Sequence, residues 1–219
     1  MATRILMVYK RFERLWHWSQ VALIMTLLFS GFAVRGVHHL MDFRTAVVVH
    51  TTAALALLVI WAFATFWLFT TGDYRHYLPT KEGMIAVVRY YTLGIFMGEE
   101  HPYHKLFWRK HNPLQAMAYL SLKVILFPAI WITGLAYLTY GVWQHGPVAN
   151  SPLGLLSDIH VAAAYAILAF VIIHVYLLTT GHSFIAHVKP MITGYDEVEL
   201  TPAEEAYLAE AKIVPMKES

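Results

Sequence analysis

The chain has 219 residues, of which 58% are hydrophobic and 14% are charged. Soluble domains carry about 25% charged residues, so this composition indicates a membrane protein. The absence of cysteine excludes thiolate-bound iron–sulfur clusters, covalently attached c-type haem and disulfides. A net charge of +2 without basic tracts excludes nucleic acid as a partner. Histidine is in surplus, with 13 residues, so metal or haem chemistry here would use imidazole ligands.

Four segments reach the length of about 20 apolar residues that a membrane-spanning helix needs. They cover residues 15–34, 45–70, 113–140 and 156–180, and such continuous runs favour helices over barrel strands. We therefore predict an all-α membrane protein, a four-transmembrane-helix bundle within residues 1–195. The apolar piece at 83–97 is too short to span the bilayer and is predicted to be an interfacial helix.

The basic residues predict how these helices are oriented. Lys and Arg concentrate before the first span, in the long loop between the second and third spans, and after the fourth. By the positive-inside rule both termini and the long loop are cytoplasmic, and the expected location is the inner membrane of a bacterium. Residues 196–219 are predicted to form an acidic cytoplasmic tail, in which Thr201 and Pro202 are typical of a helix start.

Four histidines lie inside the predicted spans and fall into two pairs at matched depths. His17 and His174 lie on the cytoplasmic side, and His50 and His160 on the periplasmic side. His160 and His174 are 14 residues apart on one helix, so they project within roughly 40° of each other and about 21 Å apart along its axis. Facing helices of a bundle can supply two axial imidazoles to a haem, and two such sites would conduct electrons across the membrane.

Other interpretations of the histidines remain open. A single histidine in a span is more often a hydrogen-bonded packing residue than a ligand, although four at paired depths favour ligands. A zinc site is disfavoured, because its ligands would lie at one depth in the membrane and these four histidines lie at two. A haem-free membrane anchor or a transporter with a histidine relay are the alternative functions. Small residues near the ligands, among them Gly31 and Gly134, would leave room for porphyrin faces.

Several motifs resemble the dihaem b-type cytochrome subunits of nickel–iron hydrogenases, formate dehydrogenases and thiosulfate reductases. The resemblance covers residues 11–194. It is carried by Arg14-Leu15-Trp16-His17-Trp18, Phe127-Pro128, Thr133-Gly134-Leu135, the pair His160 and His174 with Tyr176, and Met191-Ile192-Thr193-Gly194. It implies two b-type haems, ligated by His17 with His174 and by His50 with His160.

The same resemblance implies exchange of electrons with a quinone, menaquinone or ubiquinone, near the cytoplasmic-side haem. Asn112 and Gln115 match two positions of an Asn-x-Gly-Gln turn that lines the quinone pocket in the formate dehydrogenase members, but Leu114 replaces its glycine. The alternative is a helix cap at Asn112 followed by a first-turn proline. Lys123, inside the third span, either extends to the cytoplasmic surface or contacts a haem propionate or quinone.

The expected function is electron transfer across the membrane between a periplasmic redox partner and the quinone pool. The chain would carry at most the quinone half-reaction, as one subunit of an oxidoreductase complex. The expected partner is a periplasmic electron-transfer or catalytic subunit, either an iron–sulfur protein or a multihaem cytochrome. Membrane lipid is the other expected contact.

Overall fold

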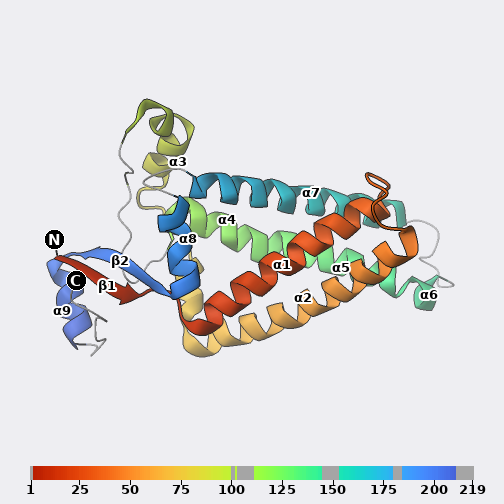
Figure 1. Ribbon diagram of the computed structural model, residues 1–219, viewed down its shortest axis with the longest axis horizontal. Coiled ribbons are helices and arrows are strands. Elements are labelled where there is room, and N and C mark those ends of the chain that lie inside the picture. Colours follow the sequence, from red (N-terminus) through yellow and green to blue (C-terminus); the bar gives the residue numbers. More distant parts are fainter. Residues whose placement is uncertain (1, 100–101, 103–110, 145–152, 180–183, 211–219) are drawn as a thin grey trace. The chain divides into compact units, whose positions relative to one another are not determined.

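A computed structural model describes residues 2–99, 102, 111–144, 153–179 and 184–210 (Figure 1). Its helices are α1 (Arg11–Val34), α2 (Phe43–Thr71), α3 (Met84–Thr92), α4 (Pro113–Ser121), α5 (Phe127–Leu138), α6 (Tyr140–Trp143), α7 (Leu153–Leu178), α8 (Phe184–Thr193) and α9 (Pro202–Glu210). Two 3₁₀ turns, η1 (Asp73–Tyr77) and η2 (Gly94–Met97), a π-helical turn η3 (Leu122–Leu126), and the strands β1 (Ala2–Met7) and β2 (Tyr195–Leu200) complete the described elements.

In the described residues, four helices are long and apolar enough to cross a membrane. They are α1, α2, the continuous helix Pro113–Leu138 formed by α4, η3 and α5, and α7. The predicted fold class, an all-α membrane protein with four spans, is confirmed. The helices begin up to four residues earlier than their apolar runs, because polar residues supply the first turns of α1 and α2. The predicted end of the fourth span at residue 180 and the tail beyond residue 210 lie outside the described residues.

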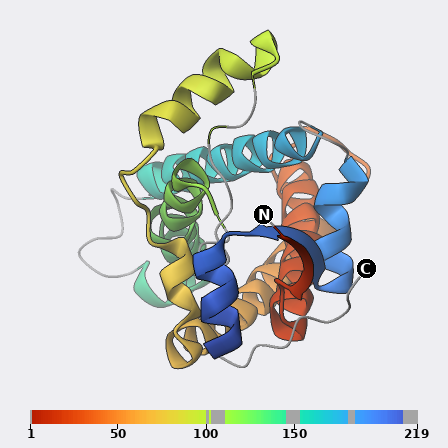
Figure 2. The ribbon, with the colours of Figure 1, turned by 90° about the vertical axis from the view of Figure 1, so that its left-hand side faces the viewer.

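Residues 16–70 and 121–174 form one compact unit, which we call the bundle unit. The end-on view in Figure 2 shows its helices α1, α2, α5 and α7 arranged around one axis. Leu122, Phe127 and Ile167 form its buried apolar cluster. Large apolar side chains also point outward, as Phe63, Phe66 and Phe69 on α2 do with 66–69% of their surface exposed. Such a surface is stable against lipid tails and unfavourable in water.

The third span changes its helical form where a proline enters. Pro128 has no N–H to donate to the carbonyl four residues earlier, and its ring would clash with that carbonyl. The π-helical turn η3 directly precedes it, and such a turn is a known way for a helix to accommodate an interruption. The third span therefore contains a wider helical turn just before Pro128.

Residues 1–15, 71–120 and 175–219 form a second compact unit, which we call the terminal unit. Its two strands were not predicted. β1 and β2 pair antiparallel, with Leu6 opposite Asp196. Leu6 and Leu200 pack with Leu208 of α9 as a small buried cluster. The N-terminal and C-terminal segments are thereby joined.

The predicted start of a helix at Thr201 is confirmed. The Thr201 backbone N–H donates to Oε2 of Glu204 at 2.9 Å, and the Glu204 N–H donates to Oγ1 of Thr201 at 3.3 Å. These reciprocal bonds satisfy two donors at the helix end. The carboxylate of Glu204 is only 1% exposed, so α9 is anchored at its first turn.

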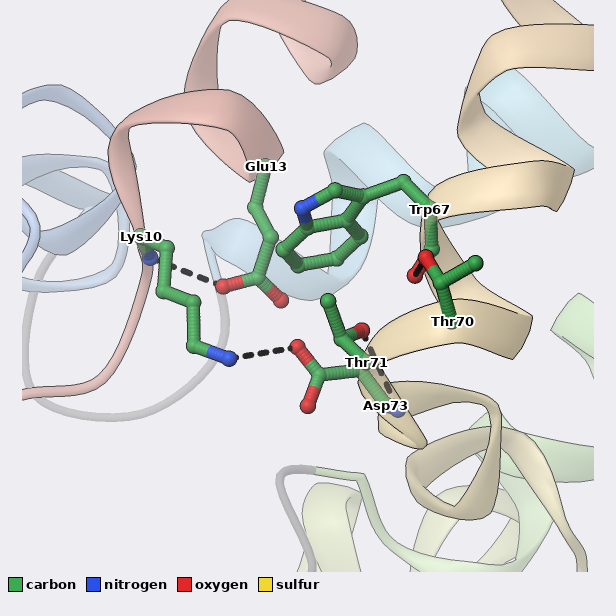
Figure 3. Close-up of polar contacts among 6 residues, drawn as sticks. All are labelled: Lys10, Glu13, Trp67, Thr70, Thr71 and Asp73. Carbon is green, nitrogen blue, oxygen red and sulfur yellow. Dashed lines mark hydrogen bonds and ion pairs between the residues drawn. The ribbon is translucent and has the colours of Figure 1, made fainter.

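The start of α1 is also held by polar contacts in the terminal unit. The Lys10 backbone N–H donates to Oε2 of Glu13 at 2.8 Å, and the Lys10 ammonium pairs with the carboxylate of Asp73 at 2.8 Å (Figure 3). The side chain of Asp73 is 13% exposed, so this ion pair is better shielded than an ordinary surface pair. It ties the chain before the first span to the chain after the second.

The predicted interfacial segment 83–97 is α3 followed by the short turn η2. Val87 of α3 is buried, whereas Ile85 and Phe96 are 85% and 76% exposed. An ion pair of 2.6 Å joins Arg89 of α3 to Glu99, which follows η2. The apolar exposure is consistent with a location at the membrane surface, which stays a prediction.

Candidate functional site

His50 of α2 and His160 of α7 face each other in the bundle unit. Their ring centroids are 6.2 Å apart and their planes make an angle of 62°. Both rings pass close to a glycine. A Cβ atom on Gly31 would lie 3.2 Å from Cε1 of His50, and one on Gly134 would lie 3.3 Å from Cε1 of His160. From the sequence, the small residues Gly31 and Gly134 were expected to leave room for porphyrin faces. The structure shows that the imidazoles of His50 and His160 occupy part of the space beside these glycines.

Each of these two histidines contacts a hydroxyl through Nδ1. Oγ of Ser30 is 3.1 Å from Nδ1 of His50, and Oγ1 of Thr133 is 2.9 Å from Nδ1 of His160. The sequence analysis did not identify Ser30 or the role of Thr133. The available signal was that a hydroxyl residue directly precedes a glycine inside two apolar spans, at Ser30-Gly31 and Thr133-Gly134.

A cavity of about 670 Å³ adjoins this pair. Its walls are mainly apolar side chains of α1, α2, α5 and α7, and they include His50, His160 and both glycines. A volume of this size falls in the range of small-molecule and cofactor sites, which are typically apolar with a few convergent polar groups. The cavity therefore suits a large apolar cofactor held at two imidazoles.

His17 of α1 and His174 of α7 form the second pair of the bundle unit. Their ring centroids are 6.5 Å apart. The ring of Phe170 lies parallel to that of His174, with 5.9 Å between centroids, and Trp18 meets His17 edge-on at 5.2 Å. Nδ1 of His17 is buried and makes no hydrogen bond to the described residues.

The separations within both pairs fit a bis-histidine haem. Metal–nitrogen bonds of about 2 Å and a distance of about 1.1 Å from nitrogen to ring centre would put two imidazole centroids on opposite sides of one metal ion about 6.2 Å apart. The observed values are 6.2 and 6.5 Å. The structure thus brings together the two pairs that the sequence predicted, at a spacing that leaves room for one iron between the rings of each pair.

A multinuclear or zinc-like site has no support in the described part of the chain. Among those residues, no three His, Cys, Asp or Glu side chains come together as ligands of a metal ion. Tetrahedral zinc takes four ligands, and catalytic zinc at least three from protein. Two imidazoles that face each other beside a mainly apolar cavity favour haem over zinc.

Lys123 lies in the π-helical turn η3. Its ammonium nitrogen is 4.3 Å from the ring centroid of Trp16, a cation–π contact. Trp16 directly precedes His17, so the lysine is close in the bundle unit to the first turn that carries a predicted ligand. A contact of Lys123 with a propionate or quinone stays a prediction.

Asn112 and Gln115 lie in the terminal unit and cap α4. The Asn112 N–H donates to Oε1 of Gln115 at 3.2 Å, and the Gln115 N–H donates to Oδ1 of Asn112 at 2.8 Å. The Asn112 amide also donates to the Tyr91 hydroxyl at 3.3 Å, and burial raises the pKa of Tyr91. The capping interpretation of these residues is confirmed, while their contact with quinone stays a prediction.

Comparison with known proteins adds a family to this geometry. The sequence model of a family described as "Prokaryotic cytochrome b561" matches residues 8–194. The chain is also 33% identical over 196 residues to "Putative cytochrome YdhU" of Escherichia coli (strain K12). That alignment covers 86% of this chain and 73% of the relative. The family match spans the four membrane helices of the described structure and both histidine pairs.

Proposed function

The chain belongs to the prokaryotic cytochrome b561 family and is thus a multi-pass membrane protein of b-haem electron transfer, and from this we propose that it holds two haems, one at each histidine pair. The observation that carries the proposal is that the two imidazoles of each pair lie 6.2 and 6.5 Å apart between ring centroids, a separation at which both could bind one haem iron. His160 and His174 share α7, so one helix contributes a ligand to each site.

The protein's part is to hold, orient and shield the cofactor. His50 with His160 and His17 with His174 would be the axial ligands. Bound haem supplies reversible one-electron chemistry, with a potential set by its ligands and surroundings. The apolar walls of the cavity exclude water from the His50 and His160 site, and the close approach of Gly31 and Gly134 keeps the two imidazoles in place.

We further propose that the chain passes electrons between a periplasmic subunit and the membrane quinone pool. Sites near the two ends of α7 would place one haem toward each membrane surface. In keeping with the family resemblance, the quinone would bind on the cytoplasmic side, near the pair His17 and His174. The partner would be an iron–sulfur protein or a multihaem cytochrome, and its identity follows from co-purification with the chain in its native membrane.

The two-haem proposal is tested by removing one ligand at a time. Purified wild-type chain should show a reduced b-type absorption band and two haems per chain. His174→Ala and His50→Ala should each retain one haem, because each removes an iron–nitrogen bond from a different site. The double variant should bind none. Haem is counted by extraction and absorption against protein concentration.

His39→Ala is the matched control, since His39 is an exposed loop histidine, and it should retain both haems. A wild-type chain without a haem band would favour the haem-free anchor. Retention of both haems in His174→Ala would show that the ligands are paired differently.

The quinone contact is tested at Gln115, where capping and binding can be separated. Gln115→Glu keeps an oxygen that accepts the Asn112 N–H, so the stability of the helix end should be preserved. If Gln115 also binds quinone, the new charge should cost one hydrogen bond to it, about 1.4 kcal/mol. The rate of haem reduction by quinol should then fall about tenfold. Stopped-flow spectroscopy with a soluble quinol measures this rate. An unchanged rate would assign Gln115 to capping alone.

A further inference from the structure

The two hydroxyl–glycine pairs of the bundle unit make the same set of contacts on different helices. On α1, Ser30 contacts Nδ1 of His50 and Gly31 faces the same ring. On α5, Thr133 contacts Nδ1 of His160 and Gly134 faces that ring. Ser30 and Thr133 are 0% and 3% exposed. Two buried hydroxyls aimed at the two histidines of one site call for a shared explanation.

The direction of these hydrogen bonds follows from proton counting. Oγ of Ser30 lies 2.7 Å from the carbonyl oxygen of Thr26, and Oγ1 of Thr133 lies 2.7 Å from that of Ala129. Two oxygens at this distance need a hydrogen between them, and a carbonyl has none. The single hydroxyl hydrogen is therefore donated to the carbonyl, and the hydroxyl accepts a hydrogen bond from Nδ1–H of the histidine.

An imidazole that carries its proton on Nδ1 has a free lone pair on Nε2. That is the nitrogen available to iron in both His50 and His160. The adjacent glycine lets each ring approach the helix closely enough to make the bond. Hydroxyl and glycine together therefore select both the tautomer and the position of the ligand.

We propose that Ser30 and Thr133 are positioning residues that orient His50 and His160 as Nε2 ligands and lower the reduction potential of the haem between them. The inference rests on the proposed function, in which this pair binds one of two haems. Hydrogen bonding at Nδ1 increases the basicity of Nε2. A more basic ligand stabilises ferric over ferrous iron, which lowers the potential.

The pair His17 and His174 provides an internal reference, because no hydroxyl of the described residues contacts Nδ1 of His17. Nδ1 of His17 is buried without a hydrogen bond to the described residues, and a lysine ammonium lies over the neighbouring Trp16 ring. A change confined to Ser30 or Thr133 should therefore move one haem and leave the other as it was.

The test is a spectroscopic redox titration of the purified holoprotein with both haems bound. Two one-electron steps are expected, and His50→Ala identifies the step that belongs to the His50 and His160 site. Ser30→Ala and Thr133→Val should shift that step upward, changing its oxidation equilibrium by about tenfold, which is 59 mV for one electron. The other step should keep its potential. Thr133→Ser and Ser30→Thr, which retain a hydroxyl, should restore the wild-type value.

Thr70→Val and Thr139→Val are matched controls. Both threonines donate a hydroxyl hydrogen to a backbone carbonyl four residues earlier, as Ser30 and Thr133 do, but neither has a hydrogen bond to a histidine in the described structure. Loss of the haem at His50 and His160 alone, with rescue by the hydroxyl variants, would also support the positioning role.

Three results would overturn the inference. The first is an unchanged potential in Ser30→Ala and Thr133→Val. The second is an equal shift of both steps, which would indicate a general disturbance of the bundle. The third is the same shift in the threonine controls. A wild-type chain that binds fewer than two haems would instead refute the two-haem proposal itself.

Discussion

The imidazoles of His50 and His160 are each held at two points, by a hydroxyl on Nδ1 and by a helix backbone that approaches at a glycine. A ligand held in this way cannot rotate about its side-chain bonds without losing a buried hydrogen bond, which is unfavourable in an apolar interior. We therefore expect the ring to keep its orientation whether or not iron is bound. Orientation by neighbouring groups is what metal-binding histidines generally require.

A methyl group at either glycine should disturb its ligand. In Gly31→Ala the new Cβ would lie 3.2 Å from Cε1 of His50, so the ring must tilt or the helices separate, at about 1–3 kcal/mol. We expect lower haem content at this site and a changed electron paramagnetic resonance spectrum of its ferric form, with the other haem unaltered.

Gly141→Ala is the control for this substitution, since nothing among the described atoms lies within 4 Å of the added Cβ. An unchanged spectrum and full haem content in Gly31→Ala would show that His50 adapts freely and that the glycine does not position it.

Among the elements, α7 has the central place because it carries one ligand of each pair and packs through Ile167 into the buried cluster of the bundle unit. α1 contributes His17, Ser30 and Gly31, and α5 contributes Thr133 and Gly134. With His50 on α2, four helices supply the ligands or support them. The helical repeat makes this arrangement sensitive to register, since one inserted residue rotates everything beyond it by 100°.

The terminal unit joins the beginning of α1 to the chain after α8. The backbone N–H groups of Val8 and Tyr9 donate to the carbonyl of Gly194 at 2.9 and 3.1 Å. The guanidinium of Arg14 donates to the carbonyl of Ile192. Two motifs of the family resemblance, one around Arg14 and one ending at Gly194, therefore meet in space.

Gly194→Ala should weaken this connection. Gly194 has φ = 92°, and a Cβ there would lie 2.8 Å from the carbonyl oxygen of Tyr9. We expect the free energy of unfolding to fall by about 1–3 kcal/mol, seen as a lower midpoint of thermal unfolding in detergent. Gly154→Ala, whose Cβ meets nothing within 4 Å, should leave the midpoint nearly unchanged. Equal midpoints for both variants would contradict the proposed connection.

At the scale of the whole molecule, the orientation in the membrane follows from the distribution of Lys and Arg. The terminal unit contains both ends of the chain, paired through β1 and β2, so both must lie on the same side of the membrane. The positive-inside rule predicts that this side is the cytoplasm. Part of the basic loop, residues 103–110, lies outside the described residues.

The orientation can be measured cleanly because the native chain has no cysteine. His39→Cys and Glu82→Cys place a thiol at exposed positions in loops predicted to be periplasmic and cytoplasmic. A membrane-impermeant maleimide should label His39→Cys in intact cells and Glu82→Cys only after lysis. The opposite pattern would invert the topology, while labelling of both in intact cells would contradict the four-span arrangement.

Much of the fold could be predicted because its signals are local. Apolar runs long enough to span a bilayer identified the four membrane helices of the described structure. Helical geometry placed His160 and His174 on the same face of one helix. Boundaries were less accurate, since polar residues such as Lys10 and Glu13 extend a helix through capping bonds beyond its apolar run. The strand pairing of β1 with β2 was missed, because it joins segments nearly 200 residues apart.

For the candidate site, the sequence by itself determined the ligand candidates and their pairing by depth, because depth follows from position along a membrane helix. Only the tertiary structure decided which neighbours orient them. Ser30 reaches His50 across 20 residues and Thr133 reaches His160 across 27, through contacts between different helices. No local pattern specifies how two helices rotate against each other. That rotation depends on the packing of the whole bundle, and it places a hydroxyl and a glycine against the imidazoles of His50 and His160.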